Sequence, residues 1–432
     1  MLKRGDKKLI NAWAFYDWAN SVYSLVISTA VFPIYYGAVT NSFDTVPFLG
    51  TIFNPISLYD YALSFSFLVV ALISPILSGI ADYTGNKMKF LKGFCLLGSL
   101  SVMCLFFFDG IDTLWVGIVF TILASIGFWG SIVFYNSYLP EVAFPEQQDK
   151  VSAKGFIYGY TGSILLLLFN LVMIQKPEWF GFTDASMPTR LTFLLVGLWW
   201  LGFAQITFRR LPNNVYDKKP EKDYIWKGFR ELKVVSNELI HHPQLKIFLI
   251  AFFLFSVGVQ TIILMAGVFG SKELGLPTPN LIATILLVQI VAIAGAYLFS
   301  RLSSRIGNIT TLKITIAIWG LVCFVAFSID KSQENVDLYF YALGGLLGLV
   351  MGAIQSLSRS TYSKLLPETE DHATYFSFYD VTEKIAIVLG TFVFGALIAL
   401  TGSMQWSVLF LAIFFLASFI VISFMKKTKY VK

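Results

Sequence analysis

Charged residues are scarce in this sequence. Asp, Glu, Lys and Arg make up 13% of its 432 residues, whereas a soluble domain carries about a quarter. Apolar residues make up 56%, and the mean hydropathy is +0.70. This composition excludes a soluble globular domain, a disordered chain and a disulfide scaffold. The net charge of +6 does not indicate nucleic-acid binding, because the few charges lie between long apolar runs.

Cysteine and histidine are also rare, with three residues of each. Cys95, Cys104 and Cys323 lie inside apolar runs and form no CxxC pair, so we expect small core side chains rather than metal ligands. The sequence contains no phosphate-binding loop, no dinucleotide-binding motif and no nucleophile elbow. We therefore expect no metal site, no cofactor and no enzymatic activity.

Long apolar runs are abundant. Those bounded by charged or turn residues span 11–37, 58–81, 91–108, 114–138, 154–174, 190–208, 246–270, 281–301, 312–329, 338–358, 374–400 and 406–425. A membrane-spanning helix needs about 20 apolar residues, so the sequence predicts an all-α membrane protein with twelve transmembrane helices. We expect the first run to be retained and not to be a signal peptide, because it is too long and contains Asp17 and Asn20.

Lysine and arginine residues lie mainly in alternate connections between these runs. The side that holds the N-terminus carries 27 of them, and the opposite side carries four. Connections rich in Lys and Arg stay in the cytoplasm. The sequence therefore predicts that both termini are cytoplasmic.

The two sets of six runs contain a weak internal repeat. The end of the second run, 78–86, resembles the end of the eighth, 300–308, in its serine, glycine and asparagine positions. The Leu-Pro-Glu segment at 139–141 recurs at 366–368, at nearly the same distance along the chain. This common offset predicts two six-helix halves in the same orientation.

The longest polar segment joins these halves. We expect an N-terminal six-helix bundle at 1–208, a cytoplasmic linker at 209–245 and a C-terminal six-helix bundle at 246–432. Within the linker, five apolar residues recur at helical spacing on an otherwise charged segment, namely Ile225, Phe229, Leu232, Val235 and Leu239. This pattern favours an amphipathic helix on the cytoplasmic membrane surface, and a solvated linker is the alternative.

Ionisable residues inside the runs are costly in a bilayer and tend to mark ion or substrate pathways. Asp17 lies in the first run, where Ser21, Ser24 and Ser28 continue a polar stripe at 4-3-4 spacing. We expect this helix face to point into the bundle. Asp17 acts either in proton coupling or gating, or it anchors a neighbouring helix through hydrogen bonds.

The eleventh run contains three charges, those of Asp380, Glu383 and Lys384. Asp380 and Lys384 are four residues apart, so they can pair along one helix face. Glu383 is then left without a dedicated cation and becomes, with Asp17, a candidate for proton exchange. The alternative is a closed charge network that acts only as a gate.

Two further groups of residues are functional candidates. Those that we expect to line a substrate cavity are Tyr16, Asn20, Tyr135, Asn136, Tyr158, Gln260, Gln355 and Tyr379. Those that we expect to form a cytoplasmic gate are Asp82, Gly85, Lys87, Lys89 and Arg359. An acid at a helix end, such as Asp82, can accept hydrogen bonds from the first N–H groups of a facing helix. Lys87 and Lys89 can contact opposing carboxylates. We expect Arg359 just beyond the tenth span.

Several segments resemble known motifs. The segment 82–89 is similar to the loop signature of the major facilitator superfamily, from which Ser78 and Met88 depart. More specific matches are Trp13–Ser21 with Phe32-Pro33, Tyr138–Glu141, Val151–Phe156, Tyr158–Tyr160, Ser358–Ser360 and Phe378–Lys384. Together they resemble the unknown major facilitator family, whose eukaryotic relatives are the autophagy-related vacuolar amino-acid effluxers.

The resemblance implies the major facilitator fold and a secondary active transporter of a small polar metabolite, an amino acid or a related compound, working by alternating access. We expect proton coupling and export. The short loops resemble bacterial members, which implies the bacterial cytoplasmic membrane. The expected partners are the substrate, membrane lipid and protons, with no nucleic acid and a monomeric state. The alternatives are an exporter of amphipathic drugs or lipid-like compounds and a non-transporting membrane sensor.

Overall fold

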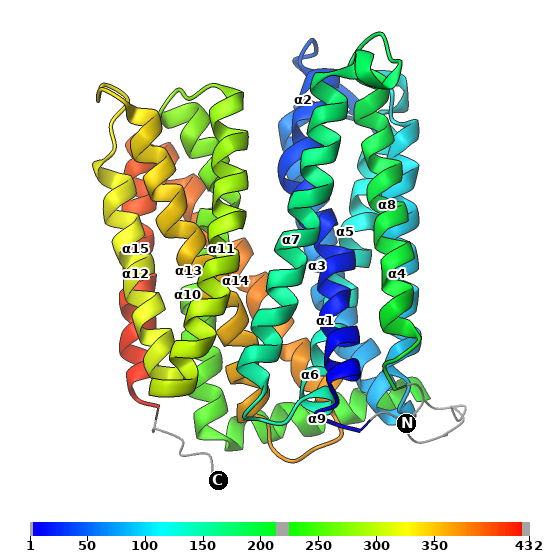
Figure 1. The fold of residues 1–432 in the computed structure, drawn as a ribbon, viewed down its shortest axis with the longest axis vertical. Coiled ribbons are helices and arrows are strands. Elements are labelled where there is room, and N and C mark those ends of the chain that lie inside the picture. Colours follow the sequence, from blue (N-terminus) through cyan, green and yellow to red (C-terminus); the bar gives the residue numbers. More distant parts are fainter. Residues whose placement is uncertain (1–2, 213–223, 426–432) are drawn as a thin grey trace. The chain divides into compact units, whose positions relative to one another are not determined.

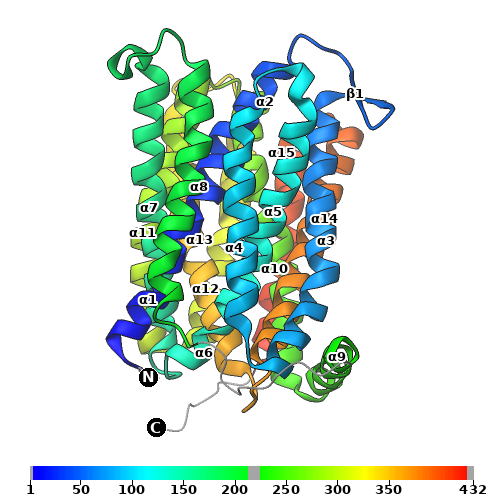
Figure 2. The same ribbon diagram turned by 90° about the vertical axis from the view of Figure 1, so that its right-hand side faces the viewer.

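The computed structural model describes residues 3–212 and 224–425 and consists mainly of long helices (Figures 1 and 2). The helices before the linker are α1 (Lys7–Val22), the π-helical η1 (Tyr23–Val31), α2 (Phe32–Thr40), α3 (Pro55–Thr84), α4 (Lys87–Cys104), the 3-10 turns η2 (Leu105–Phe107) and η3 (Ile111–Thr113), α5 (Leu114–Ser137), α6 (Leu139–Val142), α7 (Gln148–Gln175), the 3-10 turn η4 (Pro177–Phe180) and α8 (Ser186–Phe208). The later ones are α9 (Tyr224–His241), α10 (Pro243–Val268), the π-helical η5 (Phe269–Glu273), α11 (Thr278–Ile306), α12 (Asn308–Ser328), α13 (Val336–Leu365), α14 (His372–Thr401) and α15 (Met404–Ser423).

Within the described residues, 12 helical segments are long and apolar enough to cross a membrane. They follow the predicted runs in number and order, and most extend a few residues beyond them, so the prediction of twelve spans is confirmed. The largest difference concerns α13, which continues to Leu365 instead of ending at 358. Arg359 therefore lies inside this helix, with 3% of its surface exposed, and not beyond its end as the sequence suggested.

The chain forms two compact units. Unit 1 comprises Met1–Tyr138 and Tyr158–Glu231, and unit 2 comprises Leu139–Ile157 and Leu232–Lys432. Helix α7 therefore contributes to both units, its first part to unit 2 and its second part to unit 1. The predicted boundaries at 208 and 245 stay a prediction.

The two units repeat one helix-packing pattern. In unit 1, α4 packs against α5 and α8, α3 against α5, and α1 against α8. In unit 2, α12 packs against α13 and α15, α11 against α13, and α10 against α15. The sequence repeat falls at equivalent places in this pattern, because Gly85 ends α3 with φ 66° and Gly307 ends α11 with φ 89°. Glycine adopts such positive φ values without strain.

Span 1 is not a uniform α-helix. The π-helical η1 separates α1 from α2, and Pro33 lies in the first turn of α2. The wider turn changes the angular spacing of the side chains from Tyr23 onward. Asp17 is buried, whereas Ser24 is exposed. The expectation that this face points into the bundle stays a prediction.

A short β-hairpin departs from the all-helical prediction. Strand β1 (Val46–Phe48) pairs antiparallel with β2 (Thr51–Phe53) between α2 and α3. Leu49 and Gly50 join the strands with φ values of 48° and 78°. Positive φ at both turn residues is typical of tight hairpins whose twist matches that of the strands.

The predicted amphipathic helix of the linker coincides with α9. Val235 and Leu239 are buried, as expected for its apolar side. The side chains of Ile225, Phe229 and Leu232 lie outside the described residues, as does the basic segment 213–223. The location of this helix at the membrane surface stays a prediction.

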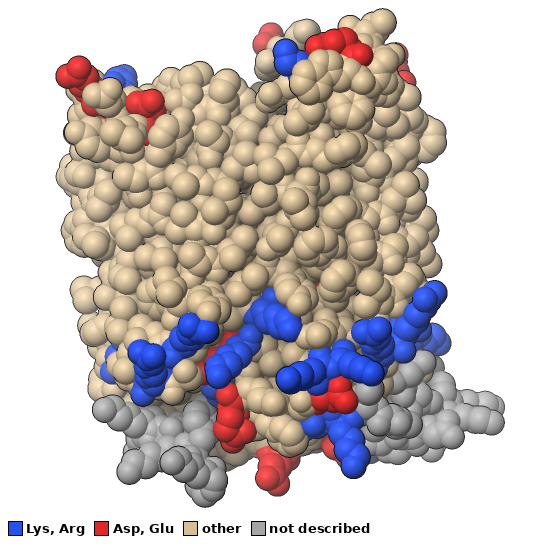
Figure 3. Space-filling model, in the orientation of Figure 1, with Lys and Arg blue, Asp and Glu red and all other residues tan. Residues whose placement is uncertain are grey.

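Charged side chains on the visible face of each unit gather near the helix ends, and the middle of the helices is covered by uncharged residues (Figure 3). Large apolar side chains such as Leu72, Phe324 and Leu416 are exposed. An uncharged exposed band between charged ends is the surface that a bilayer requires.

Glycines allow α11 and α13 to approach closely within unit 2. A Cβ atom on Gly352 would lie 2.2 Å from the carbonyl oxygen of Ala292, and one on Gly295 would lie 2.0 Å from that of Leu349. Small residues at membrane helix interfaces permit such contacts. By contrast, a Cβ atom on Gly345, also in α13, would meet no atom within 4 Å.

We expect Gly352→Ala to lower the melting temperature of the purified protein, because the added methyl group collides with backbone and costs about 1–3 kcal/mol. Gly345→Ala is the matched control and should cause no decrease. Both variants are measured by thermal unfolding in the same detergent. Equal melting temperatures for the two variants would contradict the packing described for α11 and α13.

Candidate functional site

Three groups of buried polar side chains stand out in the part of the chain that the structure describes. The Asp17 cluster lies in unit 1 between α1 and α5. The Glu383 cluster lies in unit 2 between α10 and α14. The Asp149 cluster, also in unit 2, joins the first part of α7 to α11, α12 and α13. The first two contain residues that the sequence singled out, and the third does not.

The Asp17 cluster is built on a hydrogen bond between two helices. The Tyr135 hydroxyl donates to Asp17 Oδ2 at 2.7 Å, and Asp17 is 4% exposed. Trp13 Nε1 donates to the Tyr135 carbonyl oxygen at 2.9 Å, and the two rings stack with centroids 4.6 Å apart. The Tyr16 ring packs on Tyr135 from the same helix as Asp17, at 5.0 Å. These contacts agree with the anchoring alternative for Asp17, and its part in coupling stays a prediction.

The other cavity candidates of unit 1 differ in burial. Asn20 is completely buried, Asn136 is 7% exposed, and Tyr158 is partly exposed with its ring edge-on to Phe15 at 6.1 Å. Helix α7 approaches α1 closely beside them, since a Cβ atom on Gly159 would lie 2.4 Å from Ser21 Oγ. Of these residues, Tyr158 is the one with substantial exposed surface.

The Glu383 cluster contains the charge pair that the spacing predicts. Lys384 Nζ lies 2.7 Å from Asp380 Oδ1, and the two side chains are 1% and 4% exposed. Gln260 Nε2, from α10, donates to Glu383 Oε1 at 2.6 Å. Lys384 Nζ also lies 3.7 Å from Glu383 Oε2. One ammonium group therefore serves two carboxylates and lies closer to Asp380, so Glu383 has no cation of its own, and its role in coupling or gating stays a prediction.

An aromatic group adjoins this cluster. The ring of Tyr379 stacks on Phe252 with centroids 4.0 Å apart and lies 4.9 Å from the ring of Tyr362. Tyr379 is 7% exposed, so it is mainly a packing residue between α14 and α10 in this structure. Gln355, on α13, is partly exposed.

The predicted gate residues near the α3–α4 connection lie in unit 1. Asp82 is buried in the last turn of α3, and Lys89 is exposed at the start of α4. The ammonium group of Lys87 lies over the Tyr138 ring, 5.3 Å from its centroid. Lys87 thus makes a cation–π contact at this connection.

The Asp149 cluster was not predicted. Lys364 Nζ lies 2.7 Å from Asp149 Oδ1, and both side chains are almost completely buried. Asn308 Nδ2 donates to the same carboxylate at 2.7 Å, and Ser303 Oγ donates to Oδ2 at 3.0 Å. Lys364 also donates to Asn308 Oδ1 at 3.0 Å. The network therefore closes on itself, so that each charge has several partners.

Arg359 makes a second set of contacts with the first part of α7. Its Nε donates to Ser152 Oγ and its Nη2 to the Ser152 carbonyl oxygen, each at 2.9 Å. The guanidinium group also stacks over Phe156 at 4.3 Å from the ring centroid. Ser152 Oγ in turn donates to the carbonyl oxygen of Ser356 at 2.7 Å. Two buried cations of α13 thus hold α7 within unit 2.

The sequence offered a partial signal for these residues. Asn308 belongs to the repeated segment, and Arg359 belongs to the segment Ser358–Ser360 that resembles known motifs. Ser152 likewise belongs to the matching segment Val151–Phe156, whereas Asp149 and Lys364 look like ordinary residues at the polar ends of helices. No spacing rule connects α7 with α13, so this network required the folded structure.

Comparison with known proteins identifies the family. The sequence model of the family described as "Vacuole effluxer Atg22 like" matches residues 5–147 and 143–431. The chain belongs to this family. The MFS-type transporter YxiO of Bacillus subtilis is 31% identical, over 98% of this chain and 96% of that protein. Autophagy-related protein 22-1 of Penicillium rubens is 25% identical, over 85% of this chain and 74% of that protein.

Solved structures agree with this membership at the level of the fold. The major facilitator superfamily transporter FucP in the outward conformation has a TM-score of 0.69 with 15% identity, covering 98% of both chains. The proton:xylose symporter XylE has a TM-score of 0.72 with 13% identity, covering 98% of this chain and 96% of that chain. The predicted major facilitator fold is confirmed. This member of the Atg22-like family is an integral, multi-pass membrane transporter and not an enzyme.

We expect Asp149→Asn or Lys364→Met alone to lower the melting temperature strongly, because removal of one partner leaves a buried charge and costs about 3–5 kcal/mol. The double variant Asp149→Asn/Lys364→Met should regain part of the loss. Thermal unfolding of the three variants measures the effect.

The pair formed by Arg190 and Asp109 provides the control for this experiment. These groups are 3.7 Å apart, and the Asp109 side chain is 52% exposed. Asp109→Asn should cost at most about 1 kcal/mol, since exposed ion pairs contribute little. A single variant at 149 or 364 that unfolds like Asp109→Asn would refute the importance of the buried network.

Proposed function

We propose that this transporter is proton-coupled and exports a small polar metabolite, with amino acids as the first substrate class, across the bacterial cytoplasmic membrane. The observation that carries the proposal is the pair of buried acidic clusters inside the spans of a transporter fold, around Asp17 and around Glu383. Ionisable groups in such positions are costly and tend to serve ion or substrate movement. The family description of vacuole effluxers supports export.

Glu383 is the residue at which we place proton exchange. When it is ionised, it shares the Lys384 ammonium group with Asp380 and accepts a hydrogen bond from Gln260. When it binds a proton, its attraction for Lys384 falls and the ammonium group turns fully to Asp380. Protonation also weakens the charge-assisted hydrogen bond that Gln260 of α10 donates to Glu383 of α14, so it changes the contact between these two helices. This change of partners is the means by which a proton alters helix packing.

The Asp149 cluster and Arg359 act as a gate in this proposal, together with Asp82 and the lysines near it. Helix α7 belongs to both units, and buried ionic contacts hold its first part in unit 2. Alternating access exchanges one set of packed contacts for another. The network around Asp149 is formed in one state of the cycle and broken in the other.

Gradient-driven transport tests the coupling residues. The chain is reconstituted in sealed liposomes, and counterflow of pooled labelled amino acids is measured for the wild type, Asp17→Asn and Glu383→Gln. We expect saturable uptake by the wild type. Glu383→Gln should retain counterflow, but its uptake driven by a pH gradient should fall at least about tenfold, because the amide cannot exchange a proton. Asp17→Asn should lose both activities.

Glu334→Gln is the control, because Glu334 is an exposed carboxylate in the connection before α13. It should transport as the wild type does. Unchanged gradient-driven transport by both Asp17→Asn and Glu383→Gln would exclude their roles in coupling. Competition by hydrophobic cations but not by amino acids would favour the export of amphipathic drugs, and ligand binding without flux would favour a sensor.

Cysteine labelling tests the orientation. Ser304, near the end of α11, and Lys331, after α12, are both exposed and lie at opposite ends of one span. If both termini are cytoplasmic, a membrane-impermeant maleimide should label Lys331→Cys in intact cells and Ser304→Cys only after permeabilisation. The wild type measures the background of the native cysteines, of which Cys95 and Cys323 are buried and Cys104 is partly exposed. The reverse labelling pattern would show that both termini lie on the outer side of the membrane.

A further inference from the structure

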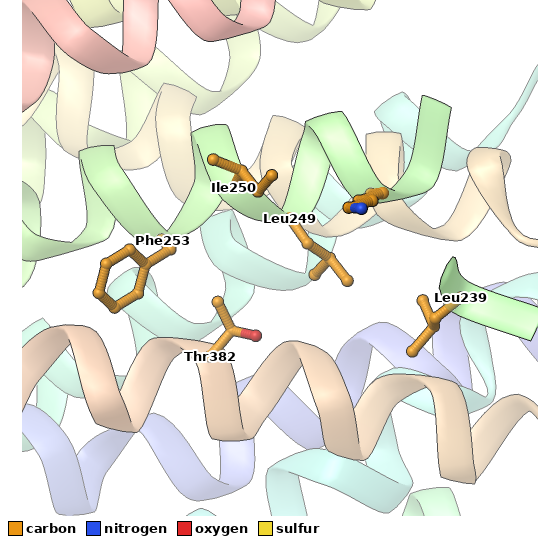
Figure 4. Close-up of a pocket in the computed structure, with 6 residues that line it drawn as sticks. Leu239, Leu249, Ile250, Phe253 and Thr382 are labelled. Carbon is orange, nitrogen blue, oxygen red and sulfur yellow. The ribbon is translucent and has the colours of Figure 1, made fainter. Parts of the chain in front are cut away.

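A groove lined by apolar side chains, one lysine and one threonine lies between α9, α10 and α14 (Figure 4). Its volume is about 320 Å³, and its lining consists of Leu239, Lys246, Leu249, Ile250, Phe253 and Thr382. Pockets that hold small molecules have volumes of roughly 300–1,000 Å³. The groove is therefore large enough for part of a ligand, and its lining does not include Gln260, Asp380, Glu383 or Lys384.

One face of α10 supplies most of the lining. Lys246, Leu249, Ile250 and Phe253 follow one another at i, i+3, i+4 and i+7, the spacing of a single helix face. Figure 4 shows Leu249, Ile250 and Phe253 along this helix, with Thr382 opposite them on α14. A cation thus begins the row, and three apolar side chains continue it toward the middle of the span.

Lys246 is the charged group of this lining. It is exposed in the first turn of α10, and among the described residues no carboxylate forms an ion pair with it. The other polar group is already satisfied, because the Thr382 hydroxyl donates to the carbonyl oxygen of Phe378 at 2.7 Å. The Lys246 ammonium group is therefore available to a ligand, and it places a positive charge at one end of an apolar surface.

We propose that this groove binds an anionic phospholipid of the surrounding bilayer. The lipid phosphate pairs with Lys246, and an acyl chain lies along Leu249, Ile250 and Phe253. An amphiphile with an anionic head and an apolar chain is the ligand that matches this lining. Both α10 and α14 are membrane spans, so lipid is the solvent at their surface, and Lys246 lies at the span end where head groups are found.

Helix α9 contributes the third wall at the same end. Leu239, a buried residue of its last turn, closes the groove beside the start of α10. A lipid held here contacts the linker helix and two spans of unit 2 at once. Bound lipid should therefore stabilise unit 2, since a ligand that binds only the folded state raises its unfolding free energy.

Lipid binding to the purified full chain tests this proposal. Phosphatidylglycerol and phosphatidylcholine with the same acyl chains are titrated separately, and occupancy is measured by native mass spectrometry, with the melting temperature as a second readout. We expect tighter binding of phosphatidylglycerol by the wild type. Lys246→Gln should weaken phosphatidylglycerol binding about fivefold, as expected for one lysine at an anionic head group, and leave phosphatidylcholine binding unchanged.

Two further variants separate the groove from general surface charge. Lys313→Gln removes a lysine from the second turn of α12 and should bind both lipids as the wild type does. Ile250→Trp fills the groove at an exposed position and should weaken binding of both lipids. Lys246→Arg keeps the charge and should retain the preference for phosphatidylglycerol, which excludes a folding defect as the cause of the Lys246→Gln effect.

Three results would overturn the proposal. Equal affinity of the wild type for the two lipids would show that the groove does not recognise the anionic head. The same loss in Lys246→Gln and Lys313→Gln would assign the preference to overall charge. Unchanged binding by Ile250→Trp would place the bound lipid elsewhere on the protein.

Discussion

Removal of a charged side chain from water into a membrane-spanning helix costs free energy that a polar partner must offset. This requirement organises the interior of both units. Asp17 meets it through the hydroxyl of Tyr135 on another helix, and Glu383 meets it through Gln260 and the neighbouring Lys384. Because each partner has to lie within hydrogen-bonding distance, the charges specify which helices are adjacent and in what rotation.

Close helix packing makes such short contacts possible. Glycines bring α11 within backbone contact of α13, and Gly159 lets α7 approach the Ser21 side chain of α1. Side chains then donate directly to backbone oxygens of neighbouring helices, as Thr207 does to Ala12 at 2.7 Å. In lipid, burial of apolar surface stabilises helix association only weakly. The close van der Waals contacts at the glycines and the hydrogen bonds between helices therefore stabilise the bundles. The polar clusters are thus part of the scaffold as well as candidates for transport.

The clusters differ in how completely their charges are neutralised, and this difference bears on function. Around Asp149 every charge has several partners and the network is closed, which suits a contact that is either fully formed or fully broken. Around Glu383 two carboxylates share one ammonium group, so their protonation states depend on one another. The first arrangement suits a gate, and the second suits proton exchange.

The number of spans, the internal repeat and the pairing of Asp380 with Lys384 followed from the sequence alone, because hydrophobicity over a helix length and i, i+4 spacing are local properties of the chain. The resemblance of short motifs also indicated the family. Only the tertiary structure decided that Lys364 neutralises Asp149, that Arg359 lies inside its helix and holds Ser152, and that span 1 contains a π-helical segment. Those features depend on which helices touch and at what rotation, and no local pattern encodes that.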